Sequence, residues 1–222
     1  MIDFSLTDEQ RMLVEMTHDF VEKEMLPHEE TLERTDALPP ELAESLKKRA
    51  IELGLHACNL PEEVGGGGLD AVSVMLIEKE LGRTSLALAE CAHRPLNILA
   101  SCEGEQVTQF LEPTVRGEKR DCIAMTEPGA GSDLRGMKCK AERVGDDWVI
   151  NGEKHFISQA SVSDYCVLFA ATGSEAFEDQ TVKAPRKYIS AFLVDFSDPG
   201  VEVAPGYKNV SHRAYTNNIL RF

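Results

Sequence analysis

The stretch from Asp121 to Gly136 constrains this chain most, because a short apolar run in it is followed by three glycines. The run at 122–126 (Cys-Ile-Ala-Met-Thr) is flanked by charge and predicts a buried strand. Glu127-Pro128 ends that strand, since proline has no N–H to donate to a sheet. The glycines at 129, 131 and 136 let the backbone turn sharply and approach a flat or anionic ligand. The stretch therefore predicts a strand and then either an ordinary connection or a ligand-binding loop.

Two familiar kinds of glycine-rich loop are excluded by the residues that follow. A phosphate-binding P-loop needs a lysine followed by Ser or Thr after the glycines, and none is present. A Rossmann turn needs a helix next. Residues 137–144 instead alternate apolar and charged side chains, which is the pattern of a strand.

The chain before this stretch has helical periodicity. Thr7-Asp-Glu-Gln10 is a capping-box pattern, and the apolar stripe behind it predicts a helix ending at Pro27. A second helix is expected to begin at Pro39-Pro40 and to close at Gly54, and a third to begin after Asp70. Residues 85–99 predict a fourth helix, kinked by the proline at 95, and residues 105–111 a short fifth.

From about residue 117 the helical spacing gives way to short alternating runs, which predict strands. Gly145-Asp146-Asp147 is a hairpin signal between two of them, and Asn151-Gly152 predicts a second tight turn. The fold class is therefore α+β, with an all-helical N-terminal domain followed by a small antiparallel β-barrel or sandwich. We place the helical domain at residues 1–119 and the β domain at 120–222.

Composition excludes several classes of function. A net charge of −15 over 222 residues argues against nucleic-acid binding, which needs a basic surface. The six cysteines show no CxxC and no paired spacing, so we expect reduced, mostly buried thiols in a cytoplasmic-type compartment. The six histidines lack metal-ligand spacing, so no metal is expected. No secretion signal and no membrane-spanning run is visible.

Glu127-Pro-Gly-Ala-Gly-Ser-Asp133, preceded by Met125-Thr126 and followed by Asn151-Gly-Glu-Lys154, resembles the flavin-binding signature of the acyl-CoA dehydrogenase family. The resemblance covers essentially the whole chain and implies the same two domains. It implies FAD as cofactor, an acyl-CoA substrate, an electron-transfer acceptor and a homo-oligomer, either a tetramer or a dimer. The implied reaction is α,β-dehydrogenation of the thioester to a trans-2-enoyl-CoA.

The resemblance also assigns roles to individual residues. Met125 and Thr126 would meet the flavin ring through backbone and hydroxyl groups, and Gly129 or Gly131 would take a conformation that suits glycine and turn N–H groups toward it. Ser132 falls at the coenzyme A moiety and the edge of the cofactor site. Many members read Trp-Ile-Thr at the second flavin segment, where this chain has Phe156-Ile157-Ser158; by spacing alone, Phe156 reads as a core aromatic. Arg186 lies near the family's coenzyme A contacts, and by composition alone it reads as a solvated charge.

No catalytic residue is expected within these 222 residues. The family carries its catalytic glutamate in a further four-helix domain, and Glu127 belongs to the signature loop as a structural residue. We therefore expect the N-terminal two-domain portion of an acyl-CoA dehydrogenase, inactive alone. Two alternatives stay open: a non-catalytic flavin or acyl-CoA binding or interaction fragment, and a flavin oxidase or monooxygenase on the same scaffold. The sequence beyond Phe222 would discriminate between them.

Overall fold

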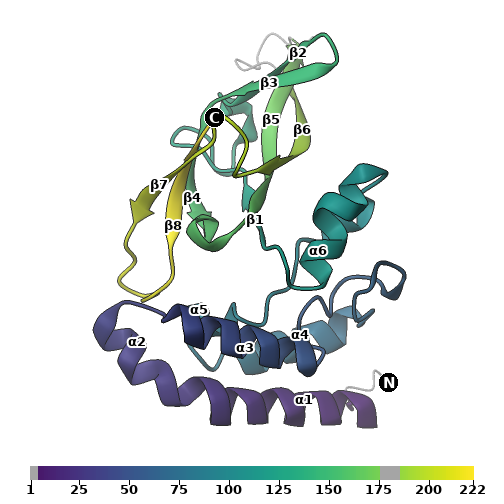
Figure 1. The fold of residues 1–222 in the computed structure, drawn as a ribbon, viewed down its shortest axis with the longest axis vertical. Helices are drawn as coiled ribbons and strands as arrows, with labels where there is room; N and C mark the ends of the chain where they lie inside the picture. The colour runs from purple at the N-terminus through teal and green to yellow at the C-terminus, as the bar shows by residue number, and fades with distance from the viewer. Residues whose placement is uncertain (1–4, 176–185) are drawn as a thin grey trace. The chain divides into compact units, whose positions relative to one another are not determined.

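The computed structural model describes residues 5–175 and 186–222, except for the side chains of Glu175 and Arg186. It forms two compact units, one of Met1–Lys119 with Asn209–Tyr215 and one of Arg120–Lys208 with Thr216–Phe222. The first unit is helical and the second carries the strands (Figure 1). The α+β class with helices first is thus confirmed.

The helical unit begins with the predicted capping box. The Thr7 hydroxyl accepts the Gln10 N–H at 3.1 Å, and the Gln10 side chain accepts the Thr7 N–H at 3.1 Å. The expected end at Pro27 is wrong. A π-helical turn and a 3-10 turn join two α-helices without a break, because Pro27 lies at the start of the 3-10 turn, where a missing N–H removes no bond. The helices are α1 (Asp8–Phe20), α2 (Glu29–Thr35), α3 (Pro40–Glu52), α4 (Ala71–Leu81), α5 (Leu86–Ala89) and α6 (Glu112–Val115).

The ends of α3 and α4 follow their sequence signals. Pro40 opens α3, and Gly54, just beyond its end, has φ +69°, a value that suits glycine. Asp70 caps α4, accepting the N–H groups of Val72 at 2.8 Å and Ser73 at 3.1 Å.

The predicted helix over 85–99 is wrong. Only α5 is α-helical there, and the chain leaves it at Glu90, well before Pro95. The carbonyl of His93 then accepts the N–H of Ala57 at 3.1 Å, a bond to a distant segment that replaces the helical one. A 3-10 turn, Asn97–Ser101, follows. Pro95 therefore lies beyond the end of the helix and does not kink it. The expected helix at 105–111 forms as a π-helical turn, Val107–Leu111, that runs on into α6.

The β unit contains two sheets. The larger has the order β1-β5-β2-β3, with β6 also paired to β5, and the smaller has the order β4-β8-β7. β1 and β2 pair with β5 in parallel, so the larger sheet is mixed and departs from the expected antiparallel pairing. The strands are β1 (Asp121–Ala124), β2 (Lys140–Val144), β3 (Asp147–Asn151), β4 (Glu153–Ser158), β5 (Tyr165–Glu175), β6 (Arg186–Asp195), β7 (Glu202–Tyr207) and β8 (Asn217–Arg221).

The predicted hairpin at Gly145 joins β2 to β3, with Gly145 at φ +65°. The predicted turn at Asn151-Gly152 is not a hairpin. The chain passes there from β3 of the larger sheet to β4, which pairs with β8 of the smaller one. A Cβ on Gly152 would lie 2.5 Å from the Cβ of Cys139, so the close approach of two segments explains this glycine.

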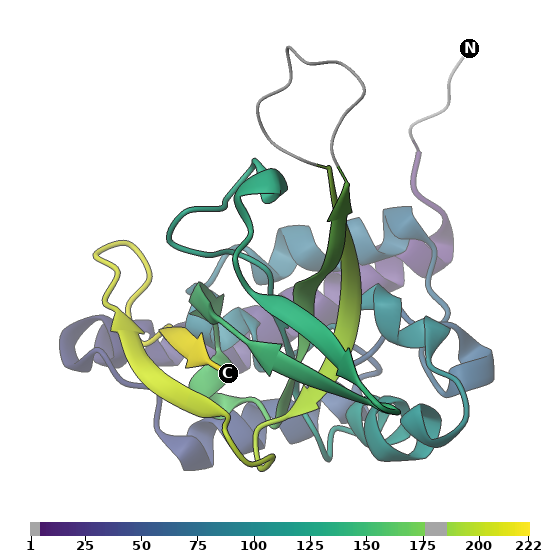
Figure 2. The ribbon, with the colours of Figure 1, turned by 90° about the horizontal axis from the view of Figure 1, so that it is seen from above.

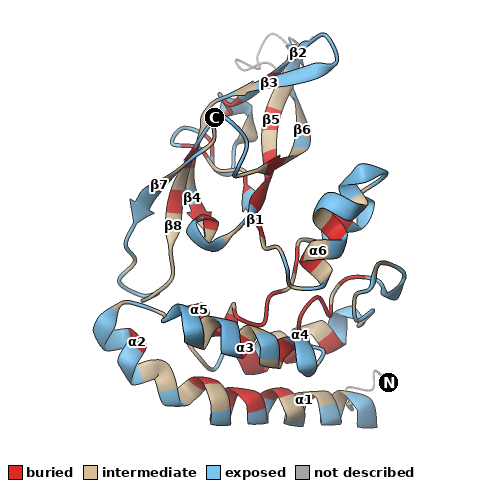
Figure 3. Cartoon of the chain, viewed as in Figure 1, coloured by how far each residue is buried: buried red, intermediate tan, exposed pale blue. Residues whose placement is uncertain are grey.

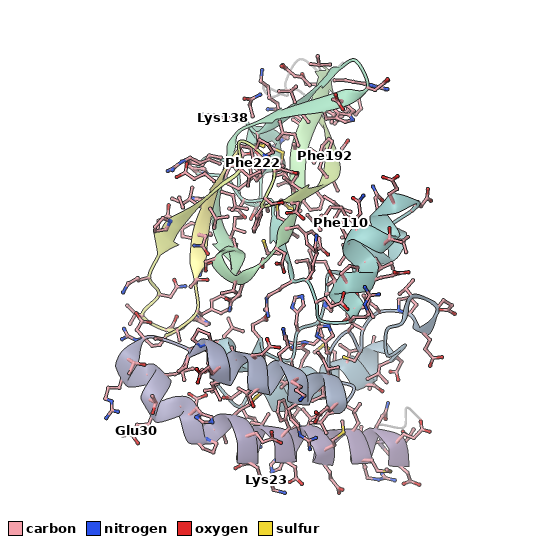
Figure 4. All side chains as sticks on the ribbon, in the orientation of Figure 1. Lys23, Glu30, Phe110, Lys138, Phe192 and Phe222 are labelled. Carbon is pink, nitrogen blue, oxygen red and sulfur yellow. The ribbon has the colours of Figure 1, made fainter. Side chains whose placement is uncertain are left out.

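Side chains of both sheets form one core in the β unit. Figure 2 shows the ribbon from above, and Figure 3 shows that buried residues concentrate along β1 and β5 while β3 is mostly exposed. Phe192 and Phe222, labelled in Figure 4, pack partly buried against this core. The buried members are Cys122, Ala124, Cys139, Ala141, Ile157, Ala160, Cys166, Leu168, Ala170, Val194 and Leu220.

Candidate functional site

The glycine-rich segment after β1 begins with a tight four-residue turn. The Glu127 N–H donates to the Ala130 carbonyl at 3.0 Å, and the Ala130 N–H donates back to the Glu127 carbonyl at 3.1 Å. Pro128 takes the second position, where its fixed φ suits a turn. The residues that follow, 131–133, are exposed. The segment therefore presents its backbone to solvent from a fixed base.

That base is an ion pair buried inside the β unit. The Lys154 Nζ donates to the Glu127 Oε1 at 2.8 Å, and the two side chains are 0% and 4% exposed. The Glu127 carboxylate also accepts the backbone N–H groups of Lys138 at 2.6 Å and Cys139 at 3.0 Å; Lys138 is labelled in Figure 4. Burial raises the pKa of Glu127, but these hydrogen bonds outweigh it and hold the pKa below its ordinary value.

Two further bonds bring the two predicted flavin segments side by side. The Lys154 Nζ donates to the Met125 carbonyl at 3.0 Å, and the His155 N–H donates to the Thr126 carbonyl at 3.0 Å. Both carbonyls are thereby engaged, and the Thr126 hydroxyl has no hydrogen-bond partner within residues 5–175 and 186–222. β4 and the segment after β1 are thus joined in one frame, although Glu127 and Lys154 are 27 positions apart in the sequence.

The glycines of the loop differ from the expectation. Neither Gly129 nor Gly131 has a positive φ, so the predicted glycine-only conformation is wrong. A Cβ at either position would meet no protein atom within 4 Å. Gly136 is the crowded position, because its Cβ would lie 2.6 Å from the Gly129 carbonyl oxygen. Glycine is therefore required by packing at 136, and the fold itself does not require it at 129 or 131.

This difference gives a matched pair of variants. Gly136→Ala is expected to destabilise the β unit by about 1–3 kcal/mol, because backbone must move to admit the methyl group. Gly131→Ala is expected to change the stability by less than about 0.5 kcal/mol, because the methyl group meets open space. Denaturant titrations of both variants check this, and equal stabilities would contradict it.

The second predicted segment lies on β4. The Phe156 ring is 51% exposed, so it is not a core aromatic. Ile157 is 2% exposed and belongs to the core, so only its backbone can reach a ligand. The Ser158 hydroxyl is half-buried and donates to the Asn217 Oδ1 at 3.3 Å. A β-bulge between Lys154 and Ile157 allows both of these residues to face inward with Phe156 outward.

The predicted substrate contacts are less well defined. Ser132 is exposed on the loop beside Gly131. Within the described residues, the hydroxyls of Ser132 and Thr126 have no hydrogen-bond partner, so both are available to a ligand. Arg186 begins β6, but its side chain lies outside the described part of the structure. The neighbouring Lys187 ammonium donates to the Met137 carbonyl.

The structure also bears on other kinds of chemistry. All six cysteines are free, and five of them are buried. Burial raises the pKa of Cys122 to about 12, so this thiol is not a nucleophile at neutral pH. Over residues 5–175 and 186–222, no group of His, Cys, Asp and Glu side chains has metal-binding geometry. In the same residues, no helix has both the length and the apolar character needed to span a bilayer.

Sequence reasoning gave no role to Lys154, although the residue was part of the quoted signature. The alternation of side chains along β4 gave no signal for it. Strict alternation would place Lys154 and Ile157 on opposite faces of β4, and only the bulge buries both. The contact of Tyr207 on β7 with Phe156, whose ring centroids are 4.3 Å apart, was also not predicted, because the two residues lie on different strands and no local pattern connects them.

Comparison with known proteins identifies the family. Residues 7–118 match the family model for the acyl-CoA dehydrogenase N-terminal domain, and residues 122–222 match that for the acyl-CoA dehydrogenase middle domain. A probable acyl-CoA dehydrogenase of Bacillus subtilis, YngJ, is 35% identical over 96% of this chain and 54% of its own length. The chain thus spans about half the length of the curated relatives it matches.

Solved structures agree with the sequence matches. The butyryl-CoA dehydrogenase of Megasphaera elsdenii superimposes with a TM-score of 0.82 at 26% identity, covering 100% of this chain and 57% of that one. An acyl-CoA dehydrogenase of Bacillus anthracis complexed with FAD has a TM-score of 0.80 at 29% identity, covering 100% of this chain and 36% of that one. The chain belongs to the acyl-CoA dehydrogenase family.

Proposed function

We propose that this chain supplies the flavin and acyl-CoA contacts of an FAD-dependent acyl-CoA dehydrogenase. The observation that carries the proposal is the frame in which the buried Glu127–Lys154 pair holds the loop after β1 against β4. From this frame an exposed backbone and the exposed Phe156 ring face solvent. The substrate class is an acyl-CoA thioester, the product a trans-2-enoyl-CoA, and an electron-transfer partner and a homo-oligomer are further expectations.

The residues present fit an isoalloxazine ring. The positions of Gly129 and Gly131 have no protein atom within 4 Å of a Cβ, so a ligand can approach the main chain there. Phe156 offers an aromatic face, and the hydroxyls of Thr126 and Ser158, which belong to the two proposed flavin segments, are the polar groups that would meet the ring. FAD, when bound, supplies the chemistry of accepting a hydride from the substrate.

The remaining contacts concern the substrate. Ser132 lies on the exposed part of the loop, where its hydroxyl can bind the polar part of an acyl-CoA. Arg186 is retained as a proposed coenzyme A contact, because a guanidinium binds phosphate oxygens. The loop carboxylates are engaged elsewhere, Glu127 with Lys154 and Asp133 with Arg135 at 2.7 Å. The chain's own residues therefore bind and orient, and they do not remove the α-proton.

Gly131→Val is the first test of this proposal. We expect the variant to lose FAD binding by at least about tenfold, because its side chain would occupy the space through which the ligand meets the backbone. Its melting temperature should stay close to that of the wild type, because no protein atom opposes the added Cβ and φ is not positive. FAD binding is measured by the change in flavin fluorescence on titration with protein. Undiminished flavin binding by a folded Gly131→Val chain would contradict the proposed site.

The reaction itself is tested in a chimera. Residues 5–222 replace the matched part of the Bacillus subtilis relative, and the purified protein is mixed with FAD and a series of acyl-CoA esters. Loss of flavin absorbance together with enoyl-CoA formation is expected. A chimera that retains FAD but responds to no acyl-CoA would favour the oxidase, monooxygenase or binding-module alternatives.

A further inference from the structure

Phe156 has an unusual backbone conformation. Its φ is +55°, in the left-handed region that bulky residues rarely adopt. Strain of this kind persists where the surrounding structure imposes it, and it concentrates at functional sites. Here the bulge of β4 imposes it, and the consequence is an aromatic ring left 51% exposed between the buried Lys154 and Ile157.

Tyr207 covers one side of this ring from another strand. The two ring centroids are 4.3 Å apart and the planes are inclined by 32°, close to a stacked arrangement. The pairing of β7 with β8 also shifts register, between Ala204 and Tyr207. Within that shift a Cβ on Gly206 would lie 1.8 Å from the Asn217 carbonyl oxygen, so glycine is required for β7 to approach. Two irregular strands thus bring the pair together.

His155 completes the group. Its ring centroid is 4.3 Å from that of Phe156, and its Nδ1 lies 3.3 Å from the Tyr207 hydroxyl oxygen. Tyr207 is itself 42% exposed. The result is a continuous surface of three rings, called here the aromatic surface (His155, Phe156, Tyr207). Two of its rings, those of Phe156 and Tyr207, are exposed to solvent, so the packing of a hydrophobic core does not explain the aromatic surface.

We propose that Tyr207 is a positioning residue of the flavin site, because its ring packs against the Phe156 ring that the proposed site presents to the flavin. Tyr207 packs against one side of the Phe156 ring and fixes its orientation, while the bulge of β4 sets the backbone conformation of Phe156. Offset stacking is favoured between rings at such separations, and each added ring contributes to affinity. The inference rests on the proposed function, since flavin is the ring that the function supplies.

The test uses lumiflavin, which is the isoalloxazine ring without ribityl or phosphate groups. The wild-type 222-residue chain is expected to quench its fluorescence on titration. Tyr207→Leu should weaken this binding about 3- to 10-fold, the equivalent of one aromatic pair. Tyr207→Phe should retain it, because the ring remains. The matched control is Tyr188→Leu on β6, which removes another exposed tyrosine of the β unit, 47% exposed, and should change nothing.

A second variant separates positioning from folding. Phe156→Gly relieves the positive φ, so its melting temperature should not fall, while lumiflavin quenching is lost. Absence of quenching by the wild type, or equal quenching by Tyr207→Leu and the wild type, would overturn the inference. If Tyr207→Leu weakens lumiflavin binding but the chimera does not react with acyl-CoA, the proposed reaction alone is overturned. If the chimera reacts with acyl-CoA but Tyr207→Leu binds lumiflavin as well as the wild type does, this inference alone is overturned.

Discussion

Glu127→Gln is expected to destabilise the β unit by about 3–5 kcal/mol, which is a large part of the stability of a domain of this size. The substitution leaves the Lys154 ammonium, which is 0% exposed, without a counter-charge. It also places an amide NH2 where a carboxylate oxygen now accepts the N–H of Lys138 or Cys139, so two donors face each other. Both effects act on the same buried network.

The control is an ion pair of the same chemistry on the surface. Lys140 and Glu142 are also 2.8 Å apart, but their side chains are 55% and 61% exposed. Glu142→Gln is expected to change the stability by less than about 1 kcal/mol, because water screens an exposed pair. The double variant Glu127→Gln/Lys154→Met should recover part of the loss, because it removes the uncompensated charge.

The measurement can be confined to the β unit. Trp148 is the only tryptophan of the chain, and it lies on β3 with its ring 5.5 Å from that of Phe192. Its fluorescence during denaturant titration therefore reports on this unit, whatever the helical unit does. Equal unfolding midpoints for Glu127→Gln and Glu142→Gln would contradict the assignment of the buried pair as the support of the loop.

The same pair predicts a dependence on pH. Because the folded pKa of Glu127 lies below its ordinary value of 4.5, its charge contributes stability fully above that value. The contribution is lost as the pH falls below 4.5 and through the lowered folded pKa. The wild type should therefore lose stability in this acid range, and Glu127→Gln should lack that part of the loss.

Local signals predicted the parts of the fold that local chemistry decides. The capping box at Thr7, the cap at Asp70 and the hairpin at Gly145 each satisfy backbone groups within a few residues. The turn after β1 was located for the same reason, since proline fixes its own φ and glycine permits a sharp turn, whereas its assignment to a flavin site came from the family resemblance. The class of each half followed from its periodicity.

Predictions failed where distant segments decide the outcome. The His93 carbonyl has a partner in Ala57, which no window over 85–99 contains. The glycine required in the loop is Gly136, because it meets Gly129 across the turn, and its neighbours in sequence give no sign of this. The bulge in β4 depends on register with β8, and it alone explains why Lys154 is buried and Phe156 exposed.

The largest effect expected concerns the 222-residue chain by itself, which should not dehydrogenate acyl-CoA at an enzymatic rate. The reaction needs a base within hydrogen-bond reach of the α-proton, and such a base is typically worth about 10²–10⁴-fold in rate. The carboxylates on the loop and on β4 are all engaged. Glu127 accepts three hydrogen bonds, and Glu153 pairs with Arg221 at 2.9 Å.

Asp133 is the remaining carboxylate of the loop, and its surroundings make it a weak base. It accepts hydrogen bonds from the Arg135 side chain and from the Arg135 N–H, and the side-chain bond from Arg135 is the main reason that its pKa is held below its ordinary value. A base with a lowered pKa has less driving force to take a proton from carbon. Asp133 is therefore assigned to the conformation of the loop.

The assay mixes the purified chain with excess FAD, a panel of acyl-CoA esters and an electron-accepting dye, and follows dye reduction and enoyl-CoA. We expect a rate at least about 10²–10⁴-fold below that of the chimera, which contains the remainder of a relative. Turnover at an ordinary enzymatic rate, roughly 1–10³ s⁻¹, would contradict the prediction. In that case Asp133→Asn and Glu127→Gln would identify the base, because the carboxylate that performs the proton transfer is the one whose amide abolishes the rate while flavin stays bound.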